Sequence, residues 1–518
     1  MAILDRVVVG SCWLVRGASP VTTFKGRVTR VPKLHKQSWR EETQIDSTYD
    51  FQRRQARRWR LEQHMTDASG KSPVFDADIV VIGAGAAGLM SAIHAGRAMH
   101  CERSNIVSTM SAPTTTASTT STTARVVALD GAHRIGIKIL VAGGGRCNVT
   151  HHAVREQDYA GSTSAAIRRV LSRFTVADCV AFFNQLGVEL KQEDTGKLFP
   201  VTDDAHTVLN ALLEAARTAG VDIRWPQRVQ TITPLVEGGF EVVGAWGALR
   251  ARRVALCSGG KSLPKSGSDG LGLELAKKLG HSVTEHVIPS LVPLVASAQH
   301  WVRTLSGLTL EAEVRVVSGT GKRLTSFTNS MLFTHFGLSG PAVLDISRYL
   351  MMERTRDAAA ALQLSFMPGC SLEQADAWLL EAKAQTVLSR LREKLPERLA
   401  KTLLEGAGIA SDRTPKQIDR DRRRALAQLM CGAPVEIVGD RGFTHAEVTA
   451  GGVPLNEMNL STMESRKCPG LYMAGEILDV DGRIGGFNFQ WAWASGFVAG
   501  ISMALSLDSF TTLSEAKP

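Results

Sequence analysis

The sequence predicts an α/β protein in which a parallel-sheet domain is interrupted by an inserted domain of mixed α+β character. Three observations lead to this prediction. A strand, a glycine-rich turn and a helix follow one another near residue 80, strand-like and helical segments then alternate up to about residue 288, and a strand with a glycine-rich turn returns after residue 440. We therefore expect the first domain to comprise 76–288 and 441–518, and the insert to comprise 289–440.

Residues 1–75 are expected to form an N-terminal extension. The first 40 residues contain eight Lys and Arg but one acidic residue, and the first 64 show no clear apolar periodicity. Two interpretations stay open. The segment is either an organelle presequence, which would direct the protein to a mitochondrion or plastid, or an over-extended gene start with Met65 as the true initiator, which would leave the protein cytoplasmic.

The composition argues against several classes of protein. The formal net charge is +10, but residues 1–40 supply +7 of it, so the rest of the chain is nearly neutral and no nucleic-acid partner is expected. The sequence lacks a run of about 20 apolar residues, which a membrane span needs. The eight cysteines are scattered without a CxxC pair, which argues against a zinc site and a dithiol relay and favours a reducing compartment. The charged segment 416–424 mixes both signs and is expected to be a solvated helix face.

The first strand and helix enclose a dinucleotide-binding pattern. Residues 78–82 are expected to form a short, mainly apolar strand and 86–97 have helical composition, and residues 83–88, which join them, read GxGxxG. In such a turn the first glycine permits the tight bend, the second lets the backbone approach a diphosphate, and the third allows close packing of helix on strand. The expected binding residues here are Gly83, Gly85, Ala86, Ala87 and Gly88.

The second strand, 125–129, ends in Asp130, which is suited to accept hydrogen bonds from an adenosine ribose. Asp130 lies 42 residues after Gly88, where about 20 is usual. A low-complexity stretch accounts for the difference, because residues 108–124 contain 12 Ser or Thr among 17 residues and removing 101–124 restores the usual spacing. We expect 101–124 to be a surface loop. On this part of the chain alone, NAD remains an alternative ligand.

In a second glycine-rich segment, KILVAGGGRCNVTH, the glycines are expected to follow another short strand, the mainly apolar run at 138–142. Its glycines permit close approach of the backbone to a ligand, and its polar side chains suit phosphate or ribityl oxygens. An ordinary glycine turn is the alternative interpretation. The candidate binding residues are Gly144, Gly145, Arg146, Cys147 and Asn148.

The remainder of the first domain alternates helices and strands. Thr175 is expected to cap a helix that runs to Gly187, and 205–220 repeats apolar residues at helical spacing. Short strands are expected at 221–225, 228–233, 240–243 and 253–256.

The C-terminal segment favours FAD over NAD. A strand at 471–474 runs into a glycine and a carboxylate, and a glycine pair precedes a helix at about 489–504. A carboxylate can bind ribityl hydroxyls, and a helix N-terminus can stabilise a reduced flavin anion. An NAD domain does not need so distant an element, whereas FAD extends further across its domain. The expected binding residues are Gly475, Glu476, Asp479, Gly485, Gly486 and Asn488.

These segments resemble a family of flavoproteins that includes aminoacetone oxidases and bacterial bile-acid dehydro-reductases, often described only as NAD(P)/FAD-dependent oxidoreductases. The matching segments, which span about 78–500, are VIGAGAAGL, GGGRCNVTH, GKLFPVTDDA, SGSDGLGLELAKKLGH, LFTHFGLSGPAVLDISR, VTAGGVPLNEMNLSTMESR and GLYMAGEILDVDGRIGGFNFQWAWASG. The resemblance implies a Rossmann-like FAD-binding domain in two parts, with an insert and with the flavin at their interface. The extension, the Ser/Thr stretch and Asp130, where the family commonly has Glu, depart from the family pattern.

The sequence leaves the chemistry open between several readings. The SGSDGLG segment resembles one in flavin-dependent fumarate reductases, which favours reduction of an activated C=C bond of a small molecule, with NADH or NADPH as a transient donor. Amine oxidation of the aminoacetone oxidase type is the alternative in the same class. A flavin-dependent tRNA-modifying enzyme and a flavin-binding protein without turnover are alternatives of other classes. Oligomeric state stays open, and no metal is expected.

Few side chains are candidates for the proton chemistry. His335 could donate a proton near neutral pH, although a His beside phenylalanines is more often a packing residue. Arg483 could pair with a carboxylate or enolate, or could simply be exposed to solvent. The full set of candidates is His335, Ser339, Arg483, Asn488 and Gln490.

Overall fold

The computed structural model describes residues 74–109, 125–382 and 384–514. Almost all of the predicted extension, and residues 110–124 of the predicted loop, lie outside these ranges. Of the described residues, 74–99, 125–234 and those from 239 onward belong to one compact unit, and the site described below lies within it.

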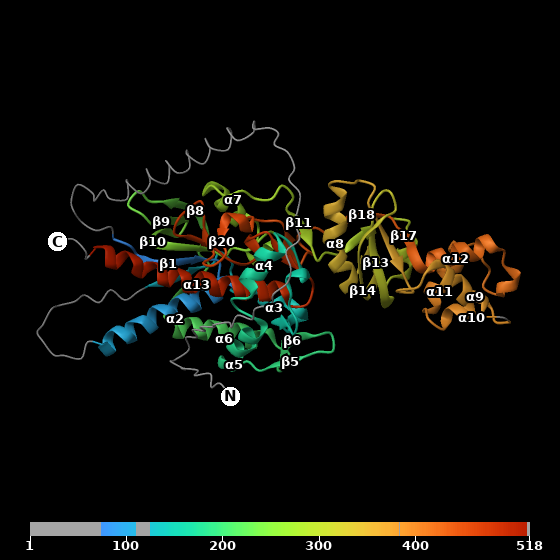
Figure 1. The fold of residues 1–518 in the computed structure, drawn as a ribbon, viewed down its shortest axis with the longest axis horizontal. Helices are drawn as coiled ribbons and strands as arrows, with labels where there is room; N and C mark the ends of the chain where they lie inside the picture. Colours follow the sequence, from blue (N-terminus) through green and yellow to red (C-terminus); the bar gives the residue numbers. More distant parts are fainter. Residues whose placement is uncertain (1–73, 110–124, 383, 515–518) are drawn as a thin grey trace, which may run out of the picture. The chain divides into compact units, whose positions relative to one another are not determined.

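The largest sheet in the described part of the chain has nine strands, with a parallel centre in the order β22-β10-β1-β2-β7 (Figure 1). These five strands are β1 (Ala77–Ile82), β2 (Val126–Leu129), β7 (Val221–Arg224), β10 (Gly247–Leu256) and β22 (Leu471–Met473). β1 and β2 are apolar and almost entirely buried, as expected of strands covered on both faces. The predicted Rossmann-like arrangement is confirmed, and strand β22 joins it from almost 400 residues further along the chain than β1.

Antiparallel strands extend this sheet and form three small ones. β8 (Val229–Pro234) and β9 (Phe240–Gly244) pair beside β10, and β20 (Met458–Asn459) and β21 (Glu464–Ser465) continue from β22. The small sheets pair β3 (Thr150–His151) and β5 (Leu190–Gln192) with β6 (Lys197–Pro200), β4 (Tyr159–Gly161) with β23 (Val480–Gly482), and β11 (Ile288–Ser290) with β19 (Val448–Ala450).

Helices pack on the nine-stranded sheet or against one another beside it. They are α2 (Ala86–Thr109), α3 (Ile137–Gly145), α4 (Ser164–Leu171), α5 (Val176–Gln185), α6 (Ala205–Thr218), α7 (Leu271–Lys278) and α13 (Phe487–Ser514). Thr175 caps α5 as predicted, in a capping box with Asp178. The long helices α2 and α13 lie side by side (Figure 1), so closely that a Cβ at Gly500 would overlap the Ser91 carbonyl oxygen.

Two predictions of local structure were wrong. Residues 138–142 begin the helix α3 instead of forming a strand, because a short apolar run suits either element and this one packs against α6 away from the sheet. α3 kinks at Ala142, and Gly143 and Gly144 then adopt positive φ. Residues 101–109 were expected to be part of a loop but continue α2.

The residues between β11 and β19 include a seven-stranded antiparallel sheet, the second largest in the described chain, in the order β17-β16-β13-β14-β15-β12-β18. Its strands are β12 (Leu294–Ala296), β13 (Thr309–Val317), β14 (Arg323–Thr334), β15 (Gly337–Ser339), β16 (Ala361–Ser365), β17 (Ala433–Val435) and β18 (Ile437–Asp440). Helix α8 (Pro341–Arg354) packs on β13 and β14.

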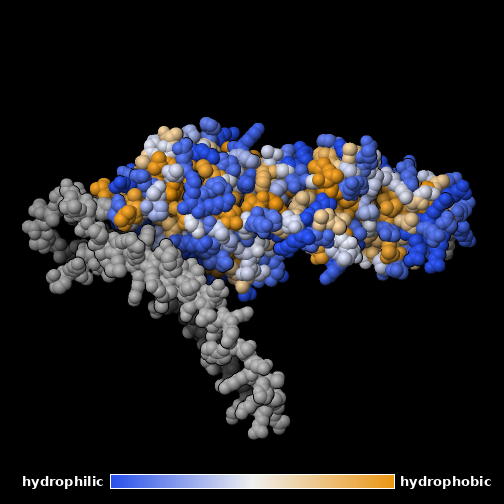
Figure 2. Space-filling view, turned by 90° about the horizontal axis from the view of Figure 1, so that it is seen from above, coloured by the Kyte–Doolittle hydropathy of each residue, from blue (hydrophilic) through white to orange (hydrophobic). Residues whose placement is uncertain are grey.

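Four helices follow β16: α9 (Leu372–Leu380), α10 (Val387–Arg392), α11 (Glu397–Gly406) and α12 (Arg420–Gly432). Figure 2 shows a largely hydrophilic surface where these helices lie. The charged segment 416–424 is mostly exposed there, with Arg423 paired to Asp376 at 2.6 Å, so the predicted solvated face is confirmed.

The buried apolar residues of the described part form two clusters. One cluster gathers residues before Gly280 and after Gly452, and the other contains only residues from Leu294 to Ile437. Where one domain ends and the other begins stays a prediction. No described helix has the length and apolar character needed to cross a bilayer.

Candidate active site

A cavity of about 650 Å³ opens at the carboxyl ends of the parallel strands. The turns after β1, β2, β10 and β22 all contribute to its lining, as do α3 and the first residues of α2 and α13. Ligands of open α/β sheets bind at this edge. Two helix N-termini facing one cavity favour an anionic ligand there.

The three glycines of the first turn have different surroundings, in agreement with their predicted roles. Gly83 has a φ of +97°, and a Cβ there would lie 2.5 Å from the Cys257 carbonyl oxygen. A Cβ at Gly88 would overlap the carbonyl oxygen of Gly83, so this glycine serves helix packing and does not line the cavity. A Cβ at Gly85 would have no neighbour within 4 Å, and Gly85 lines the cavity together with Ala86 and Ala87.

Asp130 lies at the end of β2 and lines the cavity, as predicted from its place after the strand. Its carboxylate accepts hydrogen bonds from the N–H groups of Ala84 at 2.7 Å and Ala132 at 2.8 Å. Burial raises the pKa of Asp130, and these hydrogen bonds oppose the shift. The carboxylate is therefore held rigidly against the glycine turn.

The second glycine segment divides into lining and packing residues. Gly144, Arg146 and Asn148 line the cavity, whereas Gly145 and Cys147 do not. Arg146 is anchored by Glu193 at 2.6 Å and lies over the Phe199 ring at 4.0 Å. Cys147 is fully buried, and burial raises the pKa of its thiol to about 12, so it acts as a small core residue.

The C-terminal segment also lines the cavity, with Gly475, Glu476, Gly485, Gly486 and Asn488. Asp479 was predicted to join them but does not line the cavity. It lies in a buried acidic pair instead, where desolvation and the charge of Asp481 raise its pKa to about 6.

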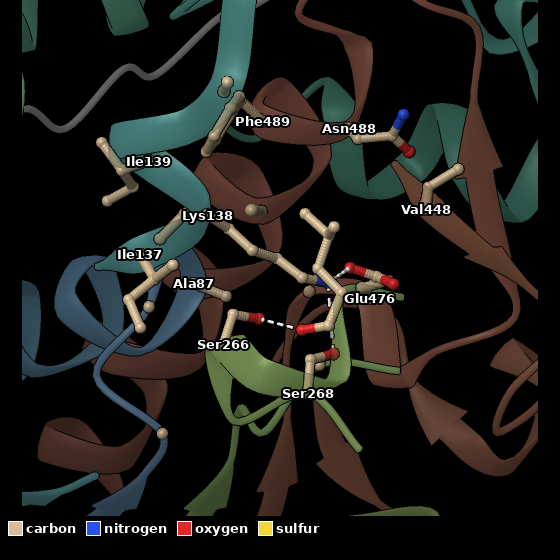
Figure 3. A pocket seen from close by; sticks show the side chains of 18 of the residues that line it. Ala87, Ile137, Lys138, Ile139, Ser266, Ser268, Val448, Glu476, Asn488 and Phe489 are labelled. Carbon is tan, nitrogen blue, oxygen red and sulfur yellow. Dashed lines mark hydrogen bonds and ion pairs between the residues drawn. The ribbon is translucent and has the colours of Figure 1, made fainter. Parts of the chain in front are cut away.

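Lys138 is a site residue that the sequence reasoning missed. Its ammonium donates to Glu476 Oε2 at 2.6 Å, Ser262 Oγ at 2.7 Å and Ser268 Oγ at 3.1 Å, and Figure 3 shows Lys138, Glu476 and Ser268 pointing toward one another. The Oε1 of Glu476 also accepts from Ser262 Oγ and Thr449 N. The apolar neighbours of Lys138 suggested a strand, and nothing local indicates a partner 338 residues away.

The polar atoms of the cavity provide a test of whether it suits FAD. Among the described residues, four of the buried side-chain atoms that lack a hydrogen-bond partner belong to residues lining this cavity: Asn148 Oδ1, Gln227 Oε1, Ser258 Oγ and Arg483 Nε. Buried polar atoms normally have partners. A ligand rich in donors and acceptors would supply them, so these residues, the open position at Gly85 and the two helix N-termini fit a flavin dinucleotide.

The catalytic candidates lie in different places. His335 is exposed, its ring contacts Phe336 with centroids 5.1 Å apart, and it lines neither this cavity nor the smaller one beside it. Ser339 also lines neither, and Gln490 is buried, where it bonds Thr150 and the Phe174 carbonyl. Arg483 lines both cavities. No group of three or more His, Cys, Asp or Glu side chains in the described ranges is placed to hold a metal ion.

Comparisons with known proteins identify the family of the chain. The family model described as HI0933-like protein Rossmann domain matches residues 110–502, a range that begins after the first glycine turn. The ribosomal RNA dihydrouridine synthase of Escherichia coli is 31% identical over 81% of this chain and 96% of its own length. The 3-dehydro-bile acid delta(4,6)-reductase of Clostridium scindens is 33% identical over 82% of this chain and 98% of its own length.

A third relative, the ribosomal RNA dihydrouridine synthase of Haemophilus influenzae, is 30% identical over 73% of this chain and 92% of its own length. Among solved structures, a flavocytochrome c3 fumarate reductase aligns with 91% of this chain and 82% of its own, at 16% identity and a TM-score of 0.40, which is too low to support a conclusion. The family match and the long alignments with curated relatives are sufficient without it. The chain belongs to the HI0933-like family of Rossmann-domain, flavin-dependent oxidoreductases.

Proposed function

We propose that this protein is an FAD-dependent reductase that saturates a C=C bond conjugated to a carbonyl group. One observation carries the proposal. The relatives at 31% and 33% identity are named for very different substrates, a uridine in ribosomal RNA and a bile acid, yet both names describe saturation of a ring C=C bond conjugated to a carbonyl. This chain aligns with nearly the full length of both, so the shared reaction is the part of their function most readily transferred.

The residues of the large cavity support binding of FAD. The turn at Gly85 and the N-terminus of α2 would hold the diphosphate, Asp130 would accept from the adenosine ribose, and Glu476 would accept from ribityl hydroxyls. The glycine pair before α13 would lie against the flavin ring. When bound, FAD supplies the hydride chemistry, and the protein supplies binding, orientation and electrostatics.

A small molecule is the substrate we favour, with NADH or NADPH as the electron donor. Most of the net charge of +10 resides in residues 1–40, so the folded part carries little of the positive charge that RNA binding requires. Ribosomal RNA is the second candidate substrate, because two relatives at 31% and 30% identity are named for it.

The proposal is tested with the purified protein. We expect it to absorb as a flavoprotein and to release FAD identifiable by mass. Under anaerobic conditions NADH or NADPH should bleach the flavin band, and cyclohex-2-enone should restore it. In a parallel arm, ribosomal RNA from cells lacking the gene should be treated with enzyme and donor and analysed for dihydrouridine by mass spectrometry.

Each outcome bears on the assignment. Reoxidation by the enone supports a small-molecule reductase, and formation of dihydrouridine supports the RNA candidate. Bleaching by an amine, with neither conjugated substrate reduced, would instead favour an oxidase of the aminoacetone oxidase type. Well-folded protein that contains no FAD and takes none up would refute all of these readings.

A further inference from the structure

A second cavity of about 400 Å³ adjoins the first, and both are lined by Lys197, Arg483 and Ile484. Its other lining residues come from the end of β3 and the segment between β3 and β4, from the turn before β6, from the start of α13, and from β14 and α8. A molecule in this cavity would abut a ligand in the first one. The cavity is therefore placed to receive the substrate of the flavin reaction proposed above, on which this inference rests.

Lys197 provides an unpaired cation where the cavities meet. It begins β6 and is half-buried, and its ammonium makes no hydrogen bond or ion pair with any residue that the structure describes. A Cβ on Gly485 would lie 3.5 Å from Lys197 Cε, so the side chain passes close to the glycine pair before α13. A half-buried ammonium with three free donors is suited to an electron-rich oxygen.

Arg483 provides a second cation, held from two sides. Its Nη1 lies 3.4 Å from Asp158 Oδ1, and its guanidinium lies over the Phe327 ring at 5.2 Å. Its Nε lies 3.6 Å from Asp345 Oδ2, too far for a hydrogen bond, and is buried without a partner. The guanidinium is thus fixed in place while its Nε–H has no hydrogen-bond partner.

Arg483 is ion-paired with Asp158 and Asp345, whereas no described carboxylate lies within ion-pair distance of the Lys197 ammonium. Asp345 Oδ1 accepts the Ile484 N–H at 2.8 Å. Burial raises the pKa of Asp345 to about 6, and the charges of Arg483 and Lys197 oppose that shift. Burial also raises the pKa of Glu447, which lines the larger cavity and also interacts with Lys197. The unpaired Lys197 ammonium at the meeting point of the cavities is therefore the group suited to an oxygen that gains negative charge, with the Arg483 guanidinium beside it.

Two aromatic side chains line the second cavity. The rings of His151 and Phe487, which both line it, are stacked with centroids 4.9 Å apart and an interplanar angle of 22°. Asn329 and Ser330 come from β14 on the insert. Stacked rings beside polar groups are suited to a planar, unsaturated ring with polar substituents.

We propose that Lys197 and Arg483 bind the carbonyl oxygen of the substrate in the second cavity, and that this substrate is a planar conjugated carbonyl compound. During reduction, a hydride from reduced FAD adds to the carbon β to the carbonyl, and the electron pair of the C=C bond moves onto the carbonyl oxygen as an enolate. Lys197 and Arg483 stabilise this charge, and a proton from water then completes the α carbon. An enone and the uracil ring of RNA share this chemistry.

The inference is tested by binding, without turnover, using 4-nitrophenol, whose phenolate oxygen mimics the enolate. The holoenzyme should bind it as the phenolate, measured by calorimetry and by its difference spectrum. Lys197→Met and Arg483→Met should each weaken binding roughly 10- to 100-fold, which is the loss expected for a charge-assisted hydrogen bond. Lys191→Met is the matched control, because Lys191 pairs with Asp203 at the surface and lines neither cavity.

The same variants are then assayed with cyclohex-2-enone and with ribosomal RNA, which separates the two sources of the conjugated carbonyl. Lys197→Met should lower kcat/KM on whichever substrate the wild type reduces, with unchanged FAD content. Wild-type reduction combined with unaltered 4-nitrophenol binding in both cation variants would overturn the inference and leave the proposed function standing. Loss of FAD from Lys197→Met would also overturn it, because Lys197 would then belong to the cofactor. If the wild type reduced neither substrate, the proposed function would fail, and the binding data alone would decide whether the cation pair exists.

Discussion

Gly85→Val is the substitution that most directly tests the placement of FAD. A Cβ at this position has no neighbour within 4 Å and points into the cavity, so the added side chain occupies ligand space and not protein space. The chain should therefore fold. Gly85 directly precedes α2, where valine is a poor capping residue, so the apoprotein should lose about 1 kcal/mol of stability.

The effect on cofactor binding should be far larger. The added side chain would displace the diphosphate from the backbone N–H groups at the start of α2. Losing two charge-assisted hydrogen bonds, at about 1.5–3 kcal/mol each, weakens binding roughly 100- to 10,000-fold. The purified variant should be folded by circular dichroism but colourless, and titration of apoprotein with FAD should give the change in Kd.

Two further substitutions serve as controls. Gly85→Ala adds only one methyl group and should weaken FAD binding less than Gly85→Val. Gly88→Val should fail differently, because a Cβ there overlaps the Gly83 carbonyl oxygen and disrupts the packing of α2 on β1 even without cofactor. A Gly85→Val protein that purified fully yellow with the wild-type Kd would show that the diphosphate does not bind at this turn.

Three other predictions follow from the geometry. Asp130→Ala removes the acceptor of two backbone N–H groups, so it should lower the free energy of unfolding in urea by about 1–3 kcal/mol and should also weaken FAD binding. An unchanged unfolding free energy and an unchanged Kd for FAD would contradict the role of this carboxylate. Arg348→Met removes the 2.6 Å ion-pair partner of the Asp481 carboxylate, whose side chain is 2% exposed, and should lower the free energy of unfolding by about 3–5 kcal/mol. Adding Asp481→Asn should restore most of this stability, and a single variant as stable as the wild type would refute the reasoning. Burial raises the pKa of Asp345 from 3.8 to about 6, so between these pH values the folded state binds a proton that the unfolded state has released. The free energy of unfolding should therefore fall by about 3 kcal/mol as the pH rises through this window. Asp345→Asn keeps an acceptor for the Ile484 N–H and should lose this part of the pH dependence in urea unfolding measured at pH values below and above the window; identical pH profiles would count against it.

Sequence reasoning succeeded where the physical cause is local. Glycine spacing specifies backbone geometry within a single turn, so the different surroundings of Gly83, Gly85 and Gly88 could be anticipated without a structure. The capping box at Thr175 depends on residues three apart. The position of Asp130 could be predicted because a residue directly after a parallel strand lies at the carboxyl edge of the sheet, whatever the length of the preceding insertion.

Tertiary structure decided what depends on residues far apart in the chain. The run at 138–142 suits a strand or a helix equally well, and only its packing against α6 selects the helix that brings Lys138 to Glu476. His335 and Arg483 were comparable candidates from the sequence. In the folded chain His335 is exposed at the surface, whereas Arg483 lines both cavities. Lys197 was not a candidate, because an unpaired cation can be recognised only once every neighbouring carboxylate has been placed. Short-range spacing thus determines the turns that bind a dinucleotide, while the side chains that meet beside it are selected by how distant elements pack.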